Sequence, residues 1–375
     1  MTELDAARQV QAKEYARRRR RLWLAGTMLG AIYAVAWLAL GWADAVRDWL
    51  ARVVAGTDAL QVAGIGAIYF GLYYLLQLPL TYYGGFLLPH QFGQSTRTLT
   101  GWMADQIRGV SVDVPIGLLL LELLYAALRL AGDLWWLWAA GGMLVFSVLL
   151  SNLAPVLIMP LFNKYTPLGE EHQDLASTLM RLAERAGTRV RGVYKFDMSR
   201  RTRAANAALT GLGNTRRIVL GDTLIREFST DEIETILAHE LGHHVHRDIP
   251  LLIGFGAVTT TVGLFLVGAT FAWIRQALNL GGLSDVANLP ALMLLFGAFG
   301  LLGMPVENAF SRWREGLADQ YALESTGKPA AYASALTRLA NQNLGEVNPE
   351  KWIVWLFYSH PPLGQRISRA NRSVV

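Results

Sequence analysis

The residues of this chain best suited to chemistry lie in one short run, LAHELGHHVHRD, at positions 237–248. The run holds four of the seven histidines in a chain of 375 residues. Residues four apart lie on one face of a helix, so His239 and His243 can both reach one metal ion. Glu240 would lie close enough to accept a proton from a water molecule there. The spacing therefore predicts a zinc site of the zincin type.

The neighbouring polar residues fit this site less well. His244 points about 100° away from His243 around the helix, and His246 has no histidine four residues upstream, where the chain has glycine. We predict polar or interfacial roles for both. Asp248 is expected to close the helix or to bind a neighbouring backbone group.

A catalytic zinc ion takes three protein ligands and an exchangeable water, so a third ligand must come from elsewhere. Position 249, six residues after His243, is isoleucine and offers none. The segment SRWREGLADQ places Glu315 and Asp319 four apart on an expected helix. In gluzincins a glutamate at this place binds zinc, and the acid one turn later holds a ligand histidine by its other ring nitrogen. We predict these two roles; the alternative is a solvated helix face with two acids.

Composition indicates a polytopic membrane protein. The chain is 53% hydrophobic and only 17% charged, which is too few charges for a soluble protein of this length. It has no cysteine, so disulfides, thiolate nucleophiles and cysteine-ligated zinc are excluded. The net charge of +5 could suggest a nucleic-acid partner, but the basic residues are sorted by membrane side. We therefore expect a lipid bilayer and no nucleic acid as partner.

Six apolar runs are candidates to cross the bilayer. Pro79 predicts a kink in the second run, and Pro155 and Pro160 interrupt the fourth. Glu122 and Arg129 in the third are expected to face each other, a neighbouring helix or a watery cavity. The runs are 22–43, 59–89, 115–130, 134–163, 249–274 and 286–306.

The basic residues predict how these spans are oriented. A cytoplasmic N-terminus puts 30 of the 34 Lys and Arg residues on the cytoplasmic side, in agreement with the positive-inside rule. Both termini and the active site are therefore expected in the cytoplasm. The segments on that side are 1–21, 90–113, 164–248 and 311–375.

The expected fold is mainly α: a polytopic helical membrane protein with six spans and a small α+β cytoplasmic zincin catalytic domain. Its parts are a membrane domain with four spans, a catalytic segment, two further spans and a C-terminal catalytic segment, at 1–163, 164–248, 249–310 and 311–375. Periodicity in the first catalytic segment predicts an amphipathic helix, three strands and the histidine-bearing helix that opens at Ser229. The amphipathic helix covers 170–186, and the strands cover 190–196, 205–212 and 217–220.

Six blocks of the sequence, in order, resemble the membrane-embedded type I CAAX prenyl endopeptidases and their bacterial relatives. The resemblance implies a metallopeptidase with one zinc ion per chain, bound by His239, His243 and Glu315. It makes Glu240 the base and places Asp319 behind a ligand. The blocks are LPLTYYGGFLLPHQFGQSTRTLTGWMADQIRG (78–109), PLFNKYTPL (160–168), NAALTGLGNTRRIVLGDTL (206–224), HELGHH (239–244), SRWREGLAD (311–319) and SHPPLGQRI (359–367).

The resemblance also implies substrate contacts. The strand around Asn206 and Ala207 is expected to pair with the substrate backbone, and His360 and Arg366 to approach the active site. Addition of a peptide to an open strand edge is a general mode of recognition. His360 is our candidate for donating a hydrogen bond to the tetrahedral oxyanion. It could equally be a turn residue before two prolines, and Asn206 an ordinary loop residue.

The predicted function is hydrolysis of membrane-associated, hydrophobic or prenylated CAAX-type peptides by a multi-pass zinc endopeptidase of the bacterial cytoplasmic membrane. Each buried CH₂ of a lipid contributes about 0.8 kcal/mol, so a prenyl group could dominate binding. Eukaryotic members have seven spans, whereas six are counted here, and we expect the missing span to be the first. Two alternatives are a quality-control protease resembling the heat-shock membrane zinc proteases, and a non-catalytic binding or transport protein. The complete set of base and ligands argues against the second alternative.

Overall fold

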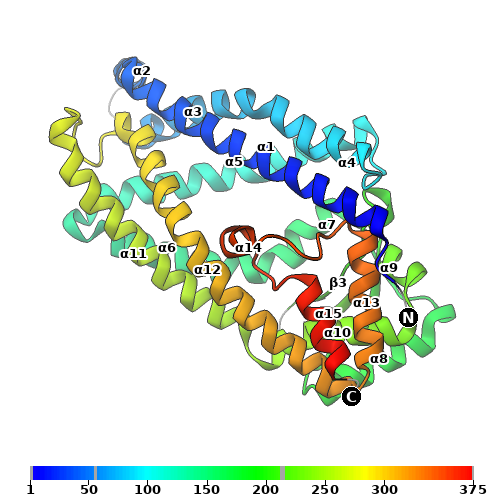
Figure 1. The fold of residues 1–375 in the computed structure, drawn as a ribbon. Helices are drawn as coiled ribbons and strands as arrows, with labels where there is room; N and C mark the ends of the chain where they lie inside the picture. Colours follow the sequence, from blue (N-terminus) through cyan, green and yellow to red (C-terminus); the bar gives the residue numbers. More distant parts are fainter. Residues whose placement is uncertain (1–2, 55–56, 212–215, 374–375) are drawn as a thin grey trace.

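The computed structural model describes residues 3–54, 57–211 and 216–373. Long helices form one end of the molecule, and shorter helices with a small sheet form the other (Figure 1). The mainly α fold predicted from the sequence is confirmed.

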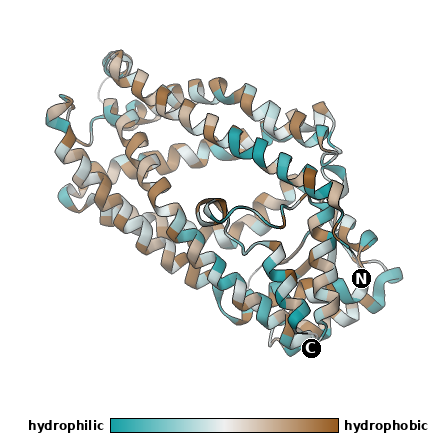
Figure 2. Cartoon of the chain, viewed as in Figure 1, coloured by the Kyte–Doolittle hydropathy of each residue, from teal (hydrophilic) through white to brown (hydrophobic). Residues whose placement is uncertain are grey.

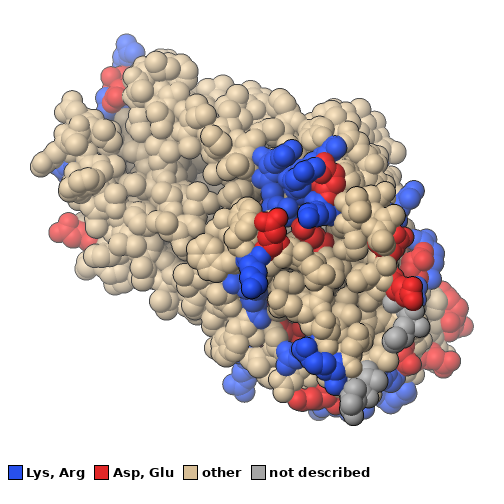
Figure 3. All heavy atoms as spheres, in the orientation of Figure 1, with Lys and Arg blue, Asp and Glu red and all other residues tan. Residues whose placement is uncertain are grey.

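Six helical stretches in the described part are long and apolar enough to cross a membrane, the number predicted. Hydrophobic residues run along them (Figure 2). Charged side chains gather mainly at the end that carries α10, α13 and α15, and the opposite half of the face in Figure 3 is almost free of them. An uncharged surface is what contact with lipid requires. The stretches are Ala6–Ala39, Asp58–Gln91, Leu99–Leu130, Gly132–Phe162, Asp248–Ala277 and Val286–Thr326.

The first and third of these helices begin well before the apolar runs that identified them. Asp5 caps α1 (Ala6–Ala39) by accepting hydrogen bonds from two N–H groups of its first turn. The arginine-rich segment before the first apolar run is therefore helical. Likewise α5 (Leu99–Leu130) continues through Pro115.

Two of the spans combine prolines with π-helical turns. Pro79 lies in α3, which continues into a π-helical turn and α4. Pro155 lies in the π-helical turn between α6 and α7. A proline lacks the backbone donor and crowds the turn before it, so the two π-helical turns accommodate Pro89 and Pro160, which lie just after them. These segments are α3 (Asp58–Tyr82), π (Tyr83–Leu87), α4 (Leu88–Gln91), α6 (Trp135–Leu153), π (Ala154–Ile158) and α7 (Met159–Phe162).

The sheet has four strands in the order β1-β2-β4-β3. β2 and β4 are parallel, and β3 pairs antiparallel with β4 at one edge. The sequence indicated β2, β3 and β4 but not β1, which has three residues and ends in proline. The strands are β1 (Tyr165–Pro167), β2 (Val193–Phe196), β3 (Ala207–Thr210) and β4 (Arg217–Gly221).

Helices α8, α10 and α13 pack with this sheet around one hydrophobic core. α10 contacts both β3 and α12, so it lies between the sheet and the last long helix. The amphipathic helix is α8, preceded by a 3₁₀ turn. The remaining helices are α2 (Trp42–Val53), α8 (Gln173–Arg185), α9 (Asp222–Glu227), α10 (Thr230–Val245), α11 (Asp248–Ala277), α12 (Leu289–Thr326), α13 (Pro329–Gln342), α14 (Lys351–Phe357) and α15 (Leu363–Arg372).

Candidate metal centre

The start of α10 fixes where its histidines lie. The Ser229 hydroxyl accepts a hydrogen bond from the N–H of Glu232, and the Glu232 carboxylate accepts one from the N–H of Ser229. This reciprocal cap satisfies backbone donors that a helix start leaves unpaired. Glu232 also accepts a hydrogen bond from Ser334 of α13. The helix is therefore anchored two to three turns before His239.

A close backbone contact brings α10 and α12 together. A Cβ atom placed on Gly242 would lie 2.9 Å from Cα and 3.1 Å from the carbonyl oxygen of Ala318. Real Cβ atoms do not approach other atoms so closely, so only glycine fits. Gly242 lies in the turn between the motif histidines, and Ala318 lies one turn after Glu315. The contact therefore keeps the predicted histidine ligands of α10 at the same height as Glu315 of α12 along the two helices.

The structure brings His239, His243 and Glu315 together. One ligand atom from each lies within 4.8 Å of the other two. The Nε2 atoms of His239 and His243 lie 3.3 and 3.4 Å from the two carboxylate oxygens of Glu315. Two imidazoles and one carboxylate are the donor set of a catalytic zinc site.

Asp319 lies behind His239, as the spacing on α12 predicted. One carboxylate oxygen of Asp319 is 3.0 Å from Nδ1 of His239. The carboxylate also accepts hydrogen bonds from the Arg366 guanidinium and from the Tyr332 hydroxyl, the latter at 2.6 Å. All four side chains are at least nine-tenths buried. Such a set fixes the ring so that Nε2 points at the cluster.

The second motif histidine has a carboxylate of its own, and the sequence interpretation of Asp248 was wrong. Oδ2 of Asp248 lies 2.7 Å from Nδ1 of His243, and Nε of Arg314 donates to Oδ1 at 2.6 Å. Arg247 has a positive φ of 54° and ends the turn between α10 and α11. That reversal brings Asp248 back beside the helix it follows, so it contacts a side chain rather than a backbone group.

The cluster fits a divalent cation. Oε2 of Glu315 is buried and has no hydrogen-bond partner among the described residues. A buried carboxylate oxygen without such a partner is costly, and a cation would compensate it. Both Nδ1 atoms face carboxylates, so both histidines can present Nε2 as a neutral ligand. The site residues therefore suit zinc better than a hard, oxygen-seeking cation.

Charges in the cluster alter the acidity of α10 residues. Burial alone would lower the pKa of His243, but Glu315 and Asp248 outweigh it and raise that pKa to about 9. Burial also opposes protonation of His239, yet Asp319 and Glu315 raise its pKa. Burial raises the pKa of Glu240, although the two histidines partly counter it. A carboxyl with a raised pKa is a stronger base once ionised.

The other predicted residues fall into two groups. His360 is brought to the cluster: its Nε2 lies 3.1 Å from Glu315, and its side chain is 57% exposed and so accessible to a substrate. Arg366 was expected to approach the active site and to bind substrate. It is 9% exposed, and it contacts Asp319, Tyr332 and His239. The structure therefore places its guanidinium behind the proposed ligand His239, and a contact with substrate stays a prediction.

Asn206 and Ala207 lie at the start of the edge strand β3, beside α10. The Asn206 side chain is exposed, whereas the Ala207 side chain is buried in the core. Ala207 can therefore contact a bound peptide only through its backbone N–H and C=O groups.

The remaining motif histidines take no part in the cluster. Nε2 of His244 faces the Arg216 guanidinium at 3.3 Å. Burial lowers the pKa of His244, and the positive charge of Arg216 lowers it further. The ring of His246 packs edge-on to Tyr321. Both roles are polar or interfacial, as predicted.

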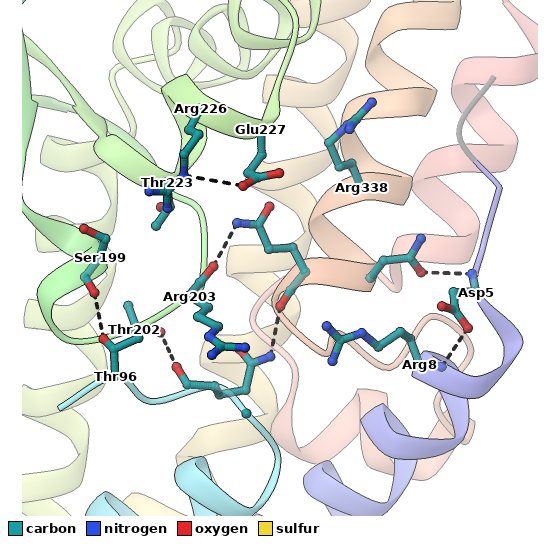
Figure 4. Close-up of a pocket in the computed structure, with 14 residues that line it drawn as sticks. Asp5, Arg8, Thr96, Ser199, Thr202, Arg203, Thr223, Arg226, Glu227 and Arg338 are labelled. Atoms are coloured by element: carbon teal, nitrogen blue, oxygen red, sulfur yellow. Dashed lines mark hydrogen bonds and ion pairs between the residues drawn. The ribbon is translucent and has the colours of Figure 1, made fainter. Parts of the chain in front are cut away.

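A polar cavity of about 610 Å³ lies elsewhere, between the N-terminal residues, α9 and α13. Its lining includes Arg8, Arg203, Arg226 and Arg338 (Figure 4). None of the predicted site residues lines it.

Comparisons with known proteins show which family the chain resembles. A model of peptidase family M48 matches residues 170–374, and a model described as CAAX prenyl protease N-terminal, five membrane helices, matches residues 2–164. A Bacillus subtilis protein named uncharacterized metalloprotease YhfN is 30% identical over 365 residues, 96% of this chain and 85% of that protein. Saccharomyces cerevisiae CAAX prenyl protease 1 is 32% identical over 325 residues, 78% of this chain and 68% of that protein.

The fold also matches a solved structure. The crystal structure of S. mikatae Ste24p superposes with a TM-score of 0.84 at 25% sequence identity, over 98% of this chain and 90% of that one. The similarity therefore extends over both the membrane helices and the cluster-bearing segments.

Proposed function

The chain belongs to peptidase family M48 and is a multi-pass membrane metalloendopeptidase, and we propose that it binds one zinc ion and cleaves CAAX-type prenylated or membrane-tethered peptides. The observation that supports this most is the convergence of His239, His243 and Glu315, with Glu240 on the same helix. A membrane protein named for CAAX processing is among its relatives.

The proposed ligands are His239, His243 and Glu315, and the donor set fits zinc. Zinc, when bound, supplies a Lewis acid for the attacking water and for the scissile carbonyl. Asp319 and Asp248 orient the two imidazoles from behind. Neither carboxylate would contact substrate.

Glu240 is the proposed general base. It adjoins His239 on α10, and its pKa is raised by burial, which makes its carboxylate a stronger base for taking the water proton and returning it to the leaving amine. His360 is the proposed oxyanion donor, because its exposed ring reaches the cluster from the opposite segment. An N–H aimed at the developing negative charge stabilises the transition state.

The open edge of β3 is the proposed binding surface for the substrate backbone. β3 pairs only with β4 in the described sheet, and it lies against α10. Main-chain hydrogen bonds to such an edge hold a peptide extended. Asn206 and Ala207 begin this edge.

The proposed division of the chain and its placement in a bacterial cytoplasmic membrane follow the charge distribution. The catalytic segments, 164–248 and 311–375, carry 21 of the 34 Lys and Arg residues. Both termini and the cluster would then face the cytoplasm, with the spans in 1–163 and 249–310 forming the membrane part.

The deciding experiment compares one peptide with and without a farnesyl group, incubated with the purified enzyme in matched detergent. We expect faster cleavage of the farnesylated peptide, and no cleavage by the variant Glu240→Gln. Equal efficiency for both peptides, together with ready cleavage of an unfolded soluble protein, would contradict the substrate class. Zinc analysis of wild type and Glu315→Ala tests the metal: one zinc per chain in wild type and little in the variant.

A further inference from the structure

Backbone groups along β3 alternate between its two sides. The Gly221 N–H donates to the Asn206 carbonyl at 2.9 Å, so the backbone of Asn206 faces β4. In an antiparallel pair the next residue faces the other way. Ala207 and Leu209 therefore direct their N–H and C=O groups to the open edge. No residue within 3–54, 57–211 or 216–373 makes a hydrogen bond to those four groups.

The open edge of β3 is already hydrogen-bonded at Ala205, two residues before Ala207. Ala205 precedes Asn206 and so faces the same side as Ala207. Its N–H donates to Oδ1 of Asn343 at 2.8 Å, and its C=O accepts from Nδ2 of the same side chain at 3.1 Å. One carboxamide thus bonds both backbone groups of Ala205, as a residue of a neighbouring antiparallel strand would.

The backbone around Asn343 keeps this carboxamide in place. The Asn343 N–H donates to Leu339 at the end of α13. The next residue, Leu344, is buried and has a positive φ of 50°. The Gln342 side chain donates to the carbonyl of Arg203 at 2.8 Å; Figure 4 shows Arg203 in the segment that leads to β3. Asn343 is therefore part of a hydrogen-bonded contact between the end of α13 and that segment.

We propose that Asn343 ends the substrate-binding edge of β3 and so sets how far the substrate backbone can pair. This rests on the edge role of β3 in the proposed function. A substrate strand pairs antiparallel to β3, the slightly more stable arrangement, so its C-terminal side runs toward Ala205. The residue two places beyond the partner of Ala207 meets Asn343 instead of the Ala205 backbone. The substrate leaves the sheet there, and residues farther toward its C-terminus gain no main-chain bonds.

The test uses one peptide series that shares a cleaved bond and is lengthened by two residues at either end. With wild type, lengthening the N-terminal side should raise kcat/KM, and lengthening the C-terminal side should not. In Asn343→Ala the Ala205 groups become available, so the C-terminal extension should raise kcat/KM by roughly fivefold, about one net hydrogen bond. If Asn343 had only a structural role, Asn343→Ala would lower the turnover of every peptide by the same factor.

Gln342→Ala is the matched control, because it removes the bond to Arg203 but leaves Asn343 on Ala205. It should keep the wild-type length profile. Asn343→Asp retains the acceptor for the Ala205 N–H and serves if the alanine variant lacks a melting transition in detergent. Two results would overturn the proposal. One is a rise in kcat/KM on C-terminal lengthening that wild type already shows; the other is the absence of that rise in both Asn343 variants. Failure of wild type to cleave any peptide of the series would instead contradict the proposed function.

Discussion

Asp248 holds Nδ1 of His243 at 2.7 Å although it lies five residues later, beyond the end of the helix that carries the histidine. Arg314, the residue before the proposed ligand Glu315, holds the other oxygen of the same carboxylate. The segment after α10 and the segment around Glu315 are therefore joined behind the second histidine. This junction lets the function of Asp248 be tested separately from that of the ligands.

We expect Asp248→Asn to bind zinc about 10- to 100-fold more weakly, because carboxylates behind ligand histidines contribute that much to affinity. Competition with a chromophoric chelator measures this. Asp231→Asn is the control, since Asp231 is an exposed acid at the start of α10 that pairs with Lys328 and lies far from the histidines along that helix. Equal affinities of the two variants would show that Asp248 does not support His243.

Zinc affinity should rise with pH. In the metal-free protein Glu315 and Asp248 hold the pKa of His243 at about 9, so His243 is protonated at neutral pH. Binding must displace this proton, and apparent affinity should increase about tenfold per pH unit for each proton displaced, levelling off above about pH 9. Titrations between pH 6.5 and 8 check the slope. A flat profile would mean that His243 is neutral before zinc binds.

Glu240→Gln should lower kcat by at least about 10²-fold, the range for loss of a general base. Zinc content and melting temperature should stay at wild-type values, because Glu240 is not a proposed ligand. Peptide hydrolysis and metal analysis on one preparation test both statements. Turnover near the wild-type rate would assign the base to another group.

Gly242→Ala should destabilise the protein by about 1–3 kcal/mol, the usual cost of forcing an extra carbon into a packed interface. Its Cβ would strike the backbone of Ala318 and move α10 away from α12, so zinc should be lost as well. Gly254→Ala in α11 is the control, because a Cβ there meets nothing within 4 Å. Thermal melting in detergent should separate the two variants.

The proposed topology can be tested by cysteine labelling, because the chain contains no cysteine of its own. A cysteine at an exposed position of α8 should react with a membrane-impermeant reagent only after the cells are opened. A cysteine in the loop after α11 should react from outside. Labelling of the α8 position in intact cells would reverse the orientation.

Helical spacing was sufficient to predict the placement of His239, Glu240 and His243, since all three lie on one helix. The contact of Asp248 with His243 was not predicted, because it depends on the chain reversal at Arg247, which spacing along a helix does not encode. An acid shortly after the motif was its only signal in the sequence. Tyr332 and Asn343 had no signal, because each meets its partner through the packing of α13.

The spans could be predicted because a bilayer demands long apolar runs, whereas β1 could not, because three residues cannot show alternation. Arg366 matched a recognised block, and sequence similarity placed it near the site without showing which side of His239 it occupies.

Helix α12 runs without interruption from the apolar segment to Glu315 and on to Thr326. Glu315 lies nine positions after Val306, the last residue of the apolar run, which is about 14 Å along the axis. An extended chain covers that distance in about four residues. If Val306 marks the membrane surface, a substrate anchored there presents to the cluster the bonds within a few residues of its anchor, and more distant bonds must loop back.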